Sequence, residues 1–398
     1  MKWCKRMTAL VAVLLLCVTT MAGCSRNKDD AITLRVWGAQ EDQELLKEMI
    51  ASFKKANPDK NYDITLGVVG ENDAQKRVLE DPEAAADVFS FPNDQILTFV
   101  NAKALYEITR NKDAIIADNT EGSVESAMVN NKLYAYPMTS DNGYFLYYDS
   151  RVLSADDVKT LDGLMEAADE ADKKVVMDVS DGWYCASYFL GAGCEIGLTA
   201  DGKQTCNFNN ADGLKAAQAI QKFTAHEAFM TGNNDIVTGV MGDTVCAAVS
   251  GTWNAEALQE KLGEGYAATK LPTFTLGDEQ VQMSSFGGYK LMGVNALTKH
   301  PAEAMALAEW LTNEQNQLLR FQKRAMGPSN RKAAADANVR ENLALSALTQ
   351  QNAFAKSQKE VLSTFWTPVE AFGLAMENKD YSKSLQVQLD TMVQQITG

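Results

Sequence analysis

The chain of 398 residues is 46% hydrophobic and 22% charged, and its formal net charge is -15. This acidity disfavours nucleic acid as a partner, because an acidic surface repels phosphate backbones and no basic cluster with interleaved aromatic residues is present. The length is large for one hydrophobic core and predicts two domains.

The N-terminus has the composition of an export signal. Basic residues precede a short apolar run over residues 9–18, and small residues follow before Cys24. The run is too short to span the ~30 Å hydrocarbon core of a bilayer, so a transmembrane anchor is not expected.

The sequence Met21-Ala22-Gly23-Cys24 resembles a bacterial lipobox, in which the cysteine is acylated after cleavage. The resemblance implies a lipoprotein signal peptide over residues 1–23, a lipid on Cys24 and a linker over residues 24–31. Acyl chains would hold the exported protein at the outer face of the cell membrane, or in the periplasm if the cell has two membranes. An ordinary cleaved signal with an accidental cysteine is the alternative.

Four further cysteines leave two interpretations open. An even number outside the cytoplasm permits disulfides, and Cys194 and Cys206 flank a predicted hairpin, whereas four buried thiols would behave as small apolar residues. Two histidines and the absence of Cys-x-x-Cys argue against a metal site. The four are Cys185, Cys194, Cys206 and Cys246.

From residue 32 onward the chain alternates strand and helix patterns. Strands are predicted at 32–37, 62–69 and 87–91, with apolar residues at helical spacing between them. Asp94 is placed to begin the next helix. The alternation predicts parallel βαβ units, with helices on both faces of an open α/β sheet.

A second α/β pattern follows over residues 153–267. The segment before it is apolar and aromatic except over residues 137–143, which we interpret as a polar crossing between two lobes. Residues 284–288 are interpreted as the return crossing. The tail is predicted to be a helix with one apolar face, made of Leu385, Leu389, Met392, Val393 and Ile396.

Four short segments occur in a characteristic order. They are Asn131-Lys132-Leu133-Tyr134-Ala135-Tyr136-Pro137, Gly251-Thr252-Trp253, Tyr266 to Phe274 with its Leu-Pro-Thr-Phe, and Ser363-Thr364-Phe365-Trp366. In this order the chain resembles maltose- and maltodextrin-binding proteins, the solute receptors of ABC-type importers, over Leu34 to Ile396.

The resemblance implies an α/β, two-lobed, periplasmic-binding-protein-like fold of class II type, with a ligand cleft between two discontinuous domains. The lobes would comprise residues 32–138 plus 289–335 and residues 139–288 plus 336–398. Hinge rotation is expected near Thr139, Ser285 and the Gly327-Pro328-Ser329 region, with closure around the ligand.

The resemblance also implies a cleft in which indole rings from two halves of the molecule stack on sugar faces, while carboxylates and amides bind the hydroxyls. Stacking positions fall on Trp183, Trp253 and Trp366. Asp141 falls on the acidic hydroxyl acceptor, and Asp94 on the acid after the third strand. Further ligand-binding candidates are Gln40, Glu41, Phe91 and Trp37.

Departures from the family pattern leave the sugar open. Phe91 stands near where the family commonly has tryptophan, Asp141 is one methylene shorter than the usual glutamate, and Gln40-Glu41 is not the usual acid–lysine pair. A maltose or maltodextrin fragment is the expected ligand, delivered to a membrane permease by a monomeric receptor. Another sugar is one alternative, and a polyamine, bound in a salt-sensitive way by the excess of acids, is another.

An exported glycoside hydrolase would need two carboxylates about 5–10 Å apart across one glycosidic bond. No Gly-x-Ser-x-Gly motif, His-Glu-x-x-His motif or phosphate loop is present, and two histidines leave few bases besides carboxylates. We therefore expect no catalytic residue and no cofactor. An adhesion or scaffold lipoprotein without a small ligand is the remaining alternative.

Overall fold

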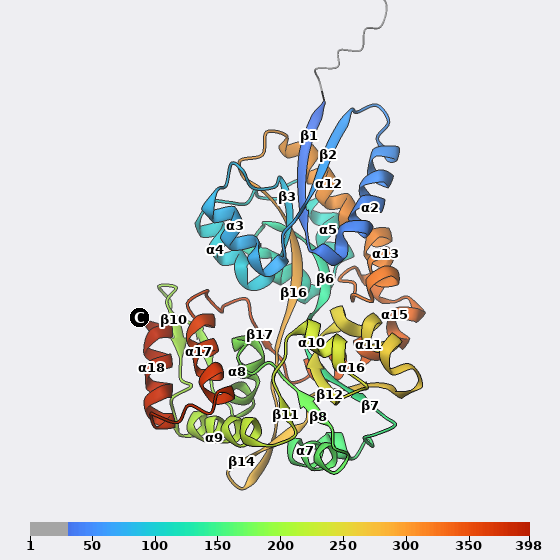
Figure 1. The fold of residues 1–398 in the computed structure, drawn as a ribbon. Helices are drawn as coiled ribbons and strands as arrows, with labels where there is room; N and C mark the ends of the chain where they lie inside the picture. Colours follow the sequence, from blue (N-terminus) through green and yellow to red (C-terminus); the bar gives the residue numbers. More distant parts are fainter. Residues whose placement is uncertain (1–30) are drawn as a thin grey trace, which may run out of the picture.

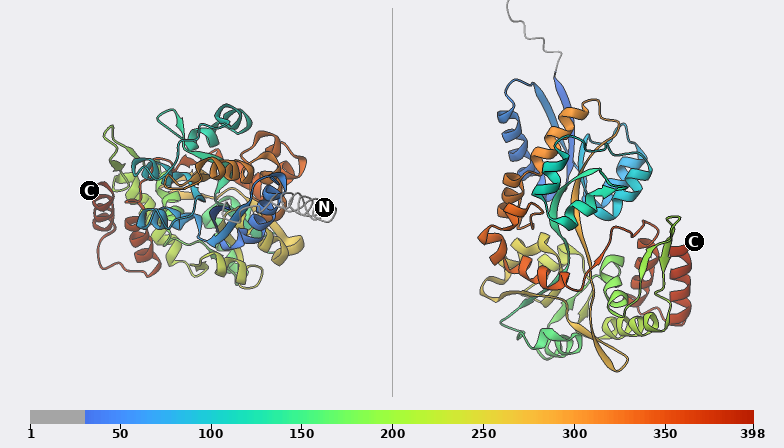
Figure 2. Two further views of the ribbon diagram at one scale, coloured as in Figure 1. Left: turned by 90° about the horizontal axis from the view of Figure 1, so that it is seen from above. Right: turned by 180° about the vertical axis from the view of Figure 1, so that it is seen from behind.

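The computed structural model describes residues 31–398, which form two lobes stacked along the long axis of the molecule (Figures 1 and 2). The chain enters at the far end of lobe one and ends in lobe two. The predicted signal peptide and the predicted lipid site at Cys24 lie outside the described residues. Within residues 31–398, no helix combines the length and apolarity needed to cross a membrane.

Lobe one is built on a six-stranded sheet in the order β17-β16-β3-β1-β2, with β6 also paired to β16. The β1 strand is parallel to β2 and β3 as predicted, whereas β16 runs antiparallel to β3 and β6. The bounds are β1 Ile32–Gly38, β2 Tyr62–Val68, β3 Val88–Pro92, β6 Ala135–Gly143, β16 Phe286–Val294 and β17 Lys356–Ser357.

Helices cover both faces of this sheet, with α2, α12 and α13 on one side and α3 and α4 on the other (Figure 1). Their bounds, with those of the neighbouring short elements, are η1 Gln40–Asp42, α2 Gln43–Ala56, η2 Glu71–Asp73, α3 Ala74–Glu80, η3 Asn93–Gln95, α4 Ile96–Asn101, α5 Lys112–Asp118, α6 Glu121–Ala127, β4 Met128–Val129, β5 Lys132–Leu133, α12 Pro301–Leu311 and α13 Glu314–Arg324.

Lobe two is built on a five-stranded sheet in the order β11-β8-β12-β7-β13, in which β12 is parallel to β8 and antiparallel to β7. The strands are β7 Phe145–Asp149, β8 Lys174–Val176, β11 Phe229–Met230, β12 Val245–Ser250 and β13 Tyr266–Thr269. Two hairpins are added, β9 Ile196–Leu198 with β10 Gln204–Cys206, and β14 Thr273–Leu276 with β15 Glu279–Gln282. The helices are α7 Leu161–Glu170, α8 Gly182–Gly191, α9 Ala211–Ala225, α10 Asn234–Val240, η5 Thr252–Asn254, α11 Ala255–Leu262, α15 Ala337–Glu341, α16 Leu343–Asn352, α17 Trp366–Glu377 and α18 Leu385–Thr397. The short helix α14 Arg331–Ala334 precedes α15 and packs against α13 of lobe one.

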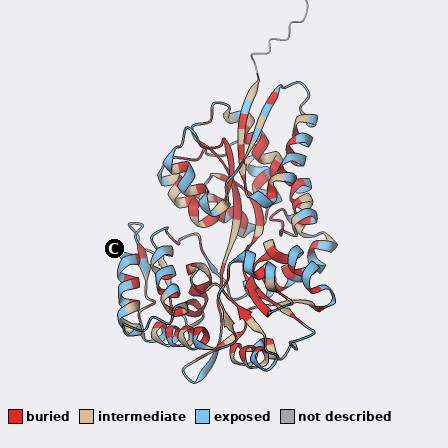
Figure 3. Cartoon of the chain, in the orientation of Figure 1, coloured by how far each residue is buried: buried red, intermediate tan, exposed pale blue. Residues whose placement is uncertain are grey.

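Each lobe has its own hydrophobic core, as the separate buried regions in Figure 3 show. The core of lobe one draws on residues 34–138 and 291–311, and the core of lobe two on residues 144–286 and 361–396. A further cluster packs α16 against the sheet of lobe two. The predicted tail helix is confirmed as α18, and four of its five apolar positions are buried, namely Leu389, Met392, Val393 and Ile396.

Two of the passages between the lobes are continuous strands, β6 and β16, so the polar crossing predicted over residues 137–143 has strand structure. Those residues belong to β6, and Thr139 pairs with Lys290 of β16 and forms a bridge to Pro328. Ser140 N–H donates to the carbonyl of Gly327 at 2.9 Å. Three crossings from distant parts of the chain therefore lie side by side, because they complete each other's backbone hydrogen bonds.

The four cysteines between residues 185 and 246 are free thiols in the structure, which agrees with the second of the two interpretations. Cys185, Cys194 and Cys246 are buried, and Cys206 is half-buried. Burial raises the pKa of the Cys194 thiol to about 12 and that of Cys206 to about 11, so both are neutral thiols at neutral pH.

Candidate functional site

Two indole rings lie together at the edge of lobe two. Trp183 is the second residue of α8, where the Asp181 side chain caps the helix by accepting from Trp183 N–H at 2.8 Å. Trp253 lies on η5, directly after β12, and its ring centroid is 5.9 Å from that of Trp183 at an interplanar angle of 37°. Tyr144 packs edge-on against Trp183 at 4.6 Å and donates its hydroxyl to the Trp183 carbonyl. Both tryptophan residues are half-buried.

Trp366 begins α17, which packs against α8. The approach is close at Gly182, where a Cβ would lie 3.1 Å from the Trp366 carbonyl oxygen. The Trp366 ring packs edge-on against Phe286 at 5.7 Å and Phe365 at 5.1 Å. All three tryptophans thus belong to lobe two, which corrects the expectation that the indoles project from both halves.

A side-chain amide connects Trp183 to lobe one. Trp183 Nε1–H donates to Gln358 Oε1 at 3.0 Å, and Gln358 Nε2 donates to Asp94 Oδ1 at 2.7 Å. Asp94 lies on η3, directly after β3, where the sequence predicted an acid at the start of a helix. Burial raises the pKa of the Asp94 carboxyl to about 7, against the opposing effect of the Gln358 hydrogen bond. The sequence interpretation missed Gln358, which stands in a polar stretch without periodicity.

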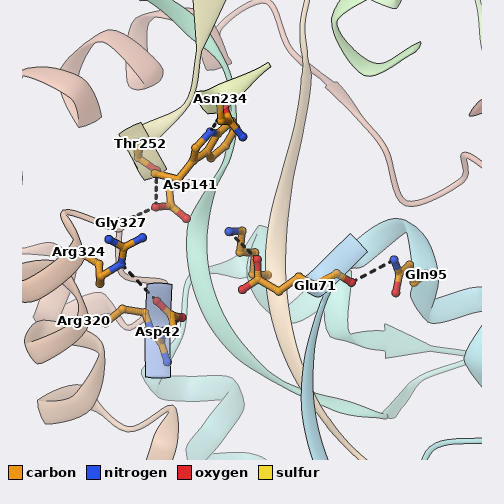
Figure 4. A network of polar contacts seen from close by, with 11 residues as sticks. Asp42, Glu71, Gln95, Asp141, Asn234, Thr252, Arg320, Arg324 and Gly327 are labelled. Atoms are coloured by element: carbon orange, nitrogen blue, oxygen red, sulfur yellow. Dashed lines mark hydrogen bonds and ion pairs between the residues drawn. The ribbon is translucent and has the colours of Figure 1, made fainter. Parts of the chain in front are cut away.

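Asp141 lies on β6 between the lobes and is 1% exposed. Its Oδ2 accepts from Thr252 Oγ1 at 2.8 Å and from Gly327 N–H at 2.7 Å (Figure 4). Its Oδ1 is buried and has no hydrogen-bond partner among residues 31–398. Since Thr252 precedes Trp253, this carboxylate is tied to the loop that carries the second indole.

A buried lysine adds a positive charge beside the indole pair. Lys290 Nζ lies 2.9 Å from Glu71 Oε2 and 5.8 Å from the ring centroid of Trp253, within the range of a cation–π contact. Burial alone would lower its pKa, but Glu71, Asp141 and Asp42 keep the pKa above the ordinary value of lysine. The ammonium is therefore charged at neutral pH.

The structure places the remaining predicted residues less favourably. Phe91 is 0% exposed and packs between Phe89 and Phe99 in the core of lobe one, so its prediction as a ligand contact is corrected. It fills an inward position of a fully buried strand. Trp37, at the end of β1, is half-buried and tilts against Phe89. Gln40 and Glu41 are exposed on η1, and Glu41 lines a surface hollow of about 600 Å³ that also includes Glu44, Lys323 and Arg324.

A second hollow, of about 560 Å³, lies between α6 of lobe one and the segment after β17. None of the three tryptophans lines it. Its wall includes Glu125, Tyr289 and Lys359, and Tyr289 is the neighbour of Lys290 in β16. Neither Lys290 nor Glu71 lines this hollow.

Comparison with known proteins assigns the chain to a family. The sequence-family model for bacterial extracellular solute-binding proteins matches residues 48–347 of this chain. A galactooligosaccharide-binding protein of Bacillus subtilis (strain 168) is 28% identical over 92% of both chains.

Solved structures resemble the whole two-lobed body. One, described as a complex with acarbose, is 28% identical with a TM-score of 0.84, covering 92% of this chain and 98% of that one. The maltodextrin-binding protein MalE1 of L. casei BL23 is 25% identical with a TM-score of 0.78, covering 92% and 99%. The Thermus thermophilus maltotriose-binding protein, at 17% identity and a TM-score of 0.77 over 92% and 99%, shares the fold. From the match over most of its length, the chain belongs to the bacterial extracellular solute-binding proteins.

Proposed function

We propose that this protein captures oligosaccharides outside the cytoplasm and delivers them to the permease of an ABC importer. The observation that carries the proposal is the neighbouring pair of half-buried indoles, Trp183 and Trp253, beside a buried carboxylate oxygen of Asp141 that lacks a partner among residues 31–398. A sugar ring has apolar C–H faces and a rim of hydroxyls, so it needs flat aromatic surface beside hydrogen-bonding groups.

The free oxygen of Asp141 supports this assignment on energetic grounds. A buried carboxylate oxygen without a hydrogen bond is costly, and a ligand hydroxyl that donates to it would remove this cost. Thr252 and Gly327 already hold the other oxygen, so the carboxylate is oriented before the ligand arrives. Pre-orientation of this kind lowers the entropy cost of binding.

An α-glucan fragment such as maltotriose is the first candidate, because the solved relatives named above include maltodextrin, maltotriose and acarbose binders. A galactooligosaccharide is the second, because the curated relative is named for that ligand. Both are uncharged or nearly so and present stackable rings. Closure of the lobes about the β6 and β16 crossings would bring lobe one onto the bound sugar, and a lipid on Cys24 would keep the receptor beside the permease.

Titration calorimetry with maltotriose, maltotetraose, acarbose, a β-galactotriose and spermidine tests the proposal. At least one oligosaccharide is expected to bind, to be recovered intact, and to bind almost equally in low and high salt. At a hundredfold excess over its dissociation constant it would stabilise the protein by about 2.7 kcal/mol. Binding of spermidine alone, weakening with salt, would instead favour a polyamine receptor.

Trp183→Ala is expected to weaken oligosaccharide binding by about tenfold or more, because it removes a stacking face. Trp310→Ala is the matched control. Trp310 is also half-buried and donates its Nε1–H to a side chain, Ser52 Oγ at 3.1 Å, but it lies on α12 away from the indole pair. Equal affinities of the two variants would remove Trp183 from the site.

A further inference from the structure

We propose that Gln358 is a positioning residue of the sugar site, which sets the orientation of the Trp183 indole and the Asp94 carboxylate relative to each other. The inference rests on the proposed function, because it assigns these two groups to ligand binding. It adds a residue that the sequence patterns did not indicate.

The contacts form a relay of three side chains, Trp183–Gln358–Asp94. The carbonyl oxygen of the amide accepts from the indole at 3.0 Å, and its nitrogen donates to the carboxylate at 2.7 Å. Gln358 is 2% exposed, so both bonds form with little competition from water. An amide offers a strong acceptor and a strong donor on the same carbon, whereas an ionised carboxylate cannot donate and an ammonium cannot accept.

The backbone around Gln358 is anchored on both sides. Ser357 pairs with Gly287 of β16, and Val361 N–H donates to the Gln358 carbonyl at 3.0 Å. The next side chain, Lys359, reaches lobe one and donates to the Met128 carbonyl at 2.8 Å. The amide is therefore presented from a fixed segment.

Gly288 provides the space for the Gln358 side chain. A Cβ at this position would lie 3.0 Å from Gln358 Cδ and 2.5 Å from Asn93 Oδ1. Asn93 Oδ1 in turn accepts from Tyr289 N–H at 3.1 Å, so the asparagine is held in place as well. A larger residue at position 288 would therefore displace the Gln358 amide, and glycine avoids this.

The relay links groups from both lobes. Trp183 starts α8 of lobe two, whereas Asp94 follows β3 of lobe one. A stacking ring must present its face at a defined angle, and its Nε1–H bond fixes the rotation about the side-chain torsions. Loss of the amide would leave the ring and the carboxylate in place but let each reorient.

Gln358→Glu separates this role from simple packing. The variant is nearly isosteric and keeps the acceptor for Trp183, but at high pH it sets a second carboxylate against Asp94. We expect affinity about tenfold below wild type at pH 8, with most of the loss recovered at pH 5.5, where one proton is shared between the two groups. Asp181 caps α8 and has a pKa raised by burial to about 6, and the Glu71–Lys290 pair lies nearby. Since these groups titrate in both wild type and Gln358→Glu, the quantity to compare at each pH is the ratio of the oligosaccharide affinity of the variant to that of wild type.

Two companion variants complete the test. Gln358→Met fills the space without polar atoms and should lose a similar factor at every pH. The double variant Gln358→Glu/Asp94→Asn exchanges the amide and the carboxylate, so it restores a donor facing an acceptor and should bind more tightly at pH 8 than Gln358→Glu alone. The proposal would be overturned if the affinity of Gln358→Glu relative to wild type did not change between pH 5.5 and pH 8. It would also be overturned if Gln358→Met bound oligosaccharide as tightly as wild type.

A measurement without ligand keeps this inference distinct from the proposed function. The indole ¹H–¹⁵N resonance of Trp183 is assigned by its loss in Trp183→Ala and is expected to shift in Gln358→Met. If wild type binds no oligosaccharide, the proposed function fails, while the resonance still decides whether the relay exists. An unshifted resonance means that Gln358 does not hold the indole.

Discussion

Burial affects the carboxylates of the site as much as their hydrogen-bond partners do. Asp94 illustrates this, since its one side-chain hydrogen bond favours the charged form while desolvation favours the neutral form more strongly. Asp141 has two donors on one oxygen and none on the other. Desolvation of both carboxylates is therefore only partly compensated by hydrogen bonds within the protein. Such groups are suited to completing their hydrogen bonding with a ligand.

Asp94→Asn is expected to stabilise the protein above pH 7. The folded-state pKa of about 7 lies above the ordinary value of 3.8, so the folded state holds its proton more tightly and wild-type stability falls as pH rises from about 4 to 7. The asparagine oxygen can still accept from Gln358 but carries no charge to desolvate. We expect a gain of about 1–2 kcal/mol at pH 8 and little at pH 4, less than the full shift implies because the side chain keeps some solvent contact.

Urea unfolding of both proteins across this pH range measures the effect. Asp63→Asn, at an exposed position of β2, is the control and should give no pH-dependent gain. A constant difference between Asp94→Asn and wild type from pH 4 to pH 8 would contradict the assignment.

At the scale of elements, the contact between α8 and α17 positions two of the three indoles. Glycines permit it from both sides: Gly182 faces the start of α17, and Gly373 of α17 faces the segment before α8. A Cβ on Gly373 would lie 1.9 Å from the Val179 carbonyl oxygen, a clash with backbone that side-chain motion cannot relieve. The helix pair is therefore as close as its backbones allow.

Gly373→Ala should lower the free energy of unfolding by about 1–3 kcal/mol and weaken oligosaccharide binding, because α17 must move and carry Trp366 with it. The control is Gly239→Ala in α10, where a Cβ meets nothing within 4 Å. There the helix propensity of alanine should stabilise the protein by up to about 1 kcal/mol. Chemical denaturation and calorimetry of the two variants, compared with wild type, check both effects, and an undiminished stability of Gly373→Ala would refute the packing argument.

For the whole molecule, the structure has two lobes with separate hydrophobic cores, joined by three adjacent crossings. A ligand with contacts to both lobes can shift such a molecule toward a closed state only through its differential affinity for that state. Lobe one supplies Asp94, lobe two supplies the indoles, and Asp141 lies on the crossing strand between them.

Small-angle scattering is expected to show a smaller radius of gyration at saturating oligosaccharide than without it. Trp183→Ala should reach the same compact form only at higher ligand concentration, because the crossings are unchanged. An identical radius with and without saturating ligand, in a sample shown by calorimetry to be fully bound, would exclude closure.

Local patterns in the sequence determined much of the architecture. The alternation in β1 and the apolar spacing of α18 depend on neighbours within one turn or one strand, so their elements could be predicted directly. The same holds for the parallel direction of β1, β2 and β3, which follows from the alternation of strands with helices, whereas their order in the sheet was not predicted. Asp94 was predicted at the start of a helix from its place after the third strand, and it lies on η3 there. Trp183 was assigned to stacking by the resemblance alone, and its contact with a ligand stays a prediction.

Tertiary structure decided the rest, because it depends on residues that are far apart in the chain. Residues 137–143 look polar but form a strand, since β16 supplies their hydrogen bonds from about 150 residues away. Phe91 is covered by Phe99 from a neighbouring helix, and Trp366 lies in the same lobe as Trp183 because α17 returns to pack on α8. Gln358 acquires its role only where β17 joins β16 and brings its amide between Trp183 and Asp94, a meeting that no local periodicity encodes.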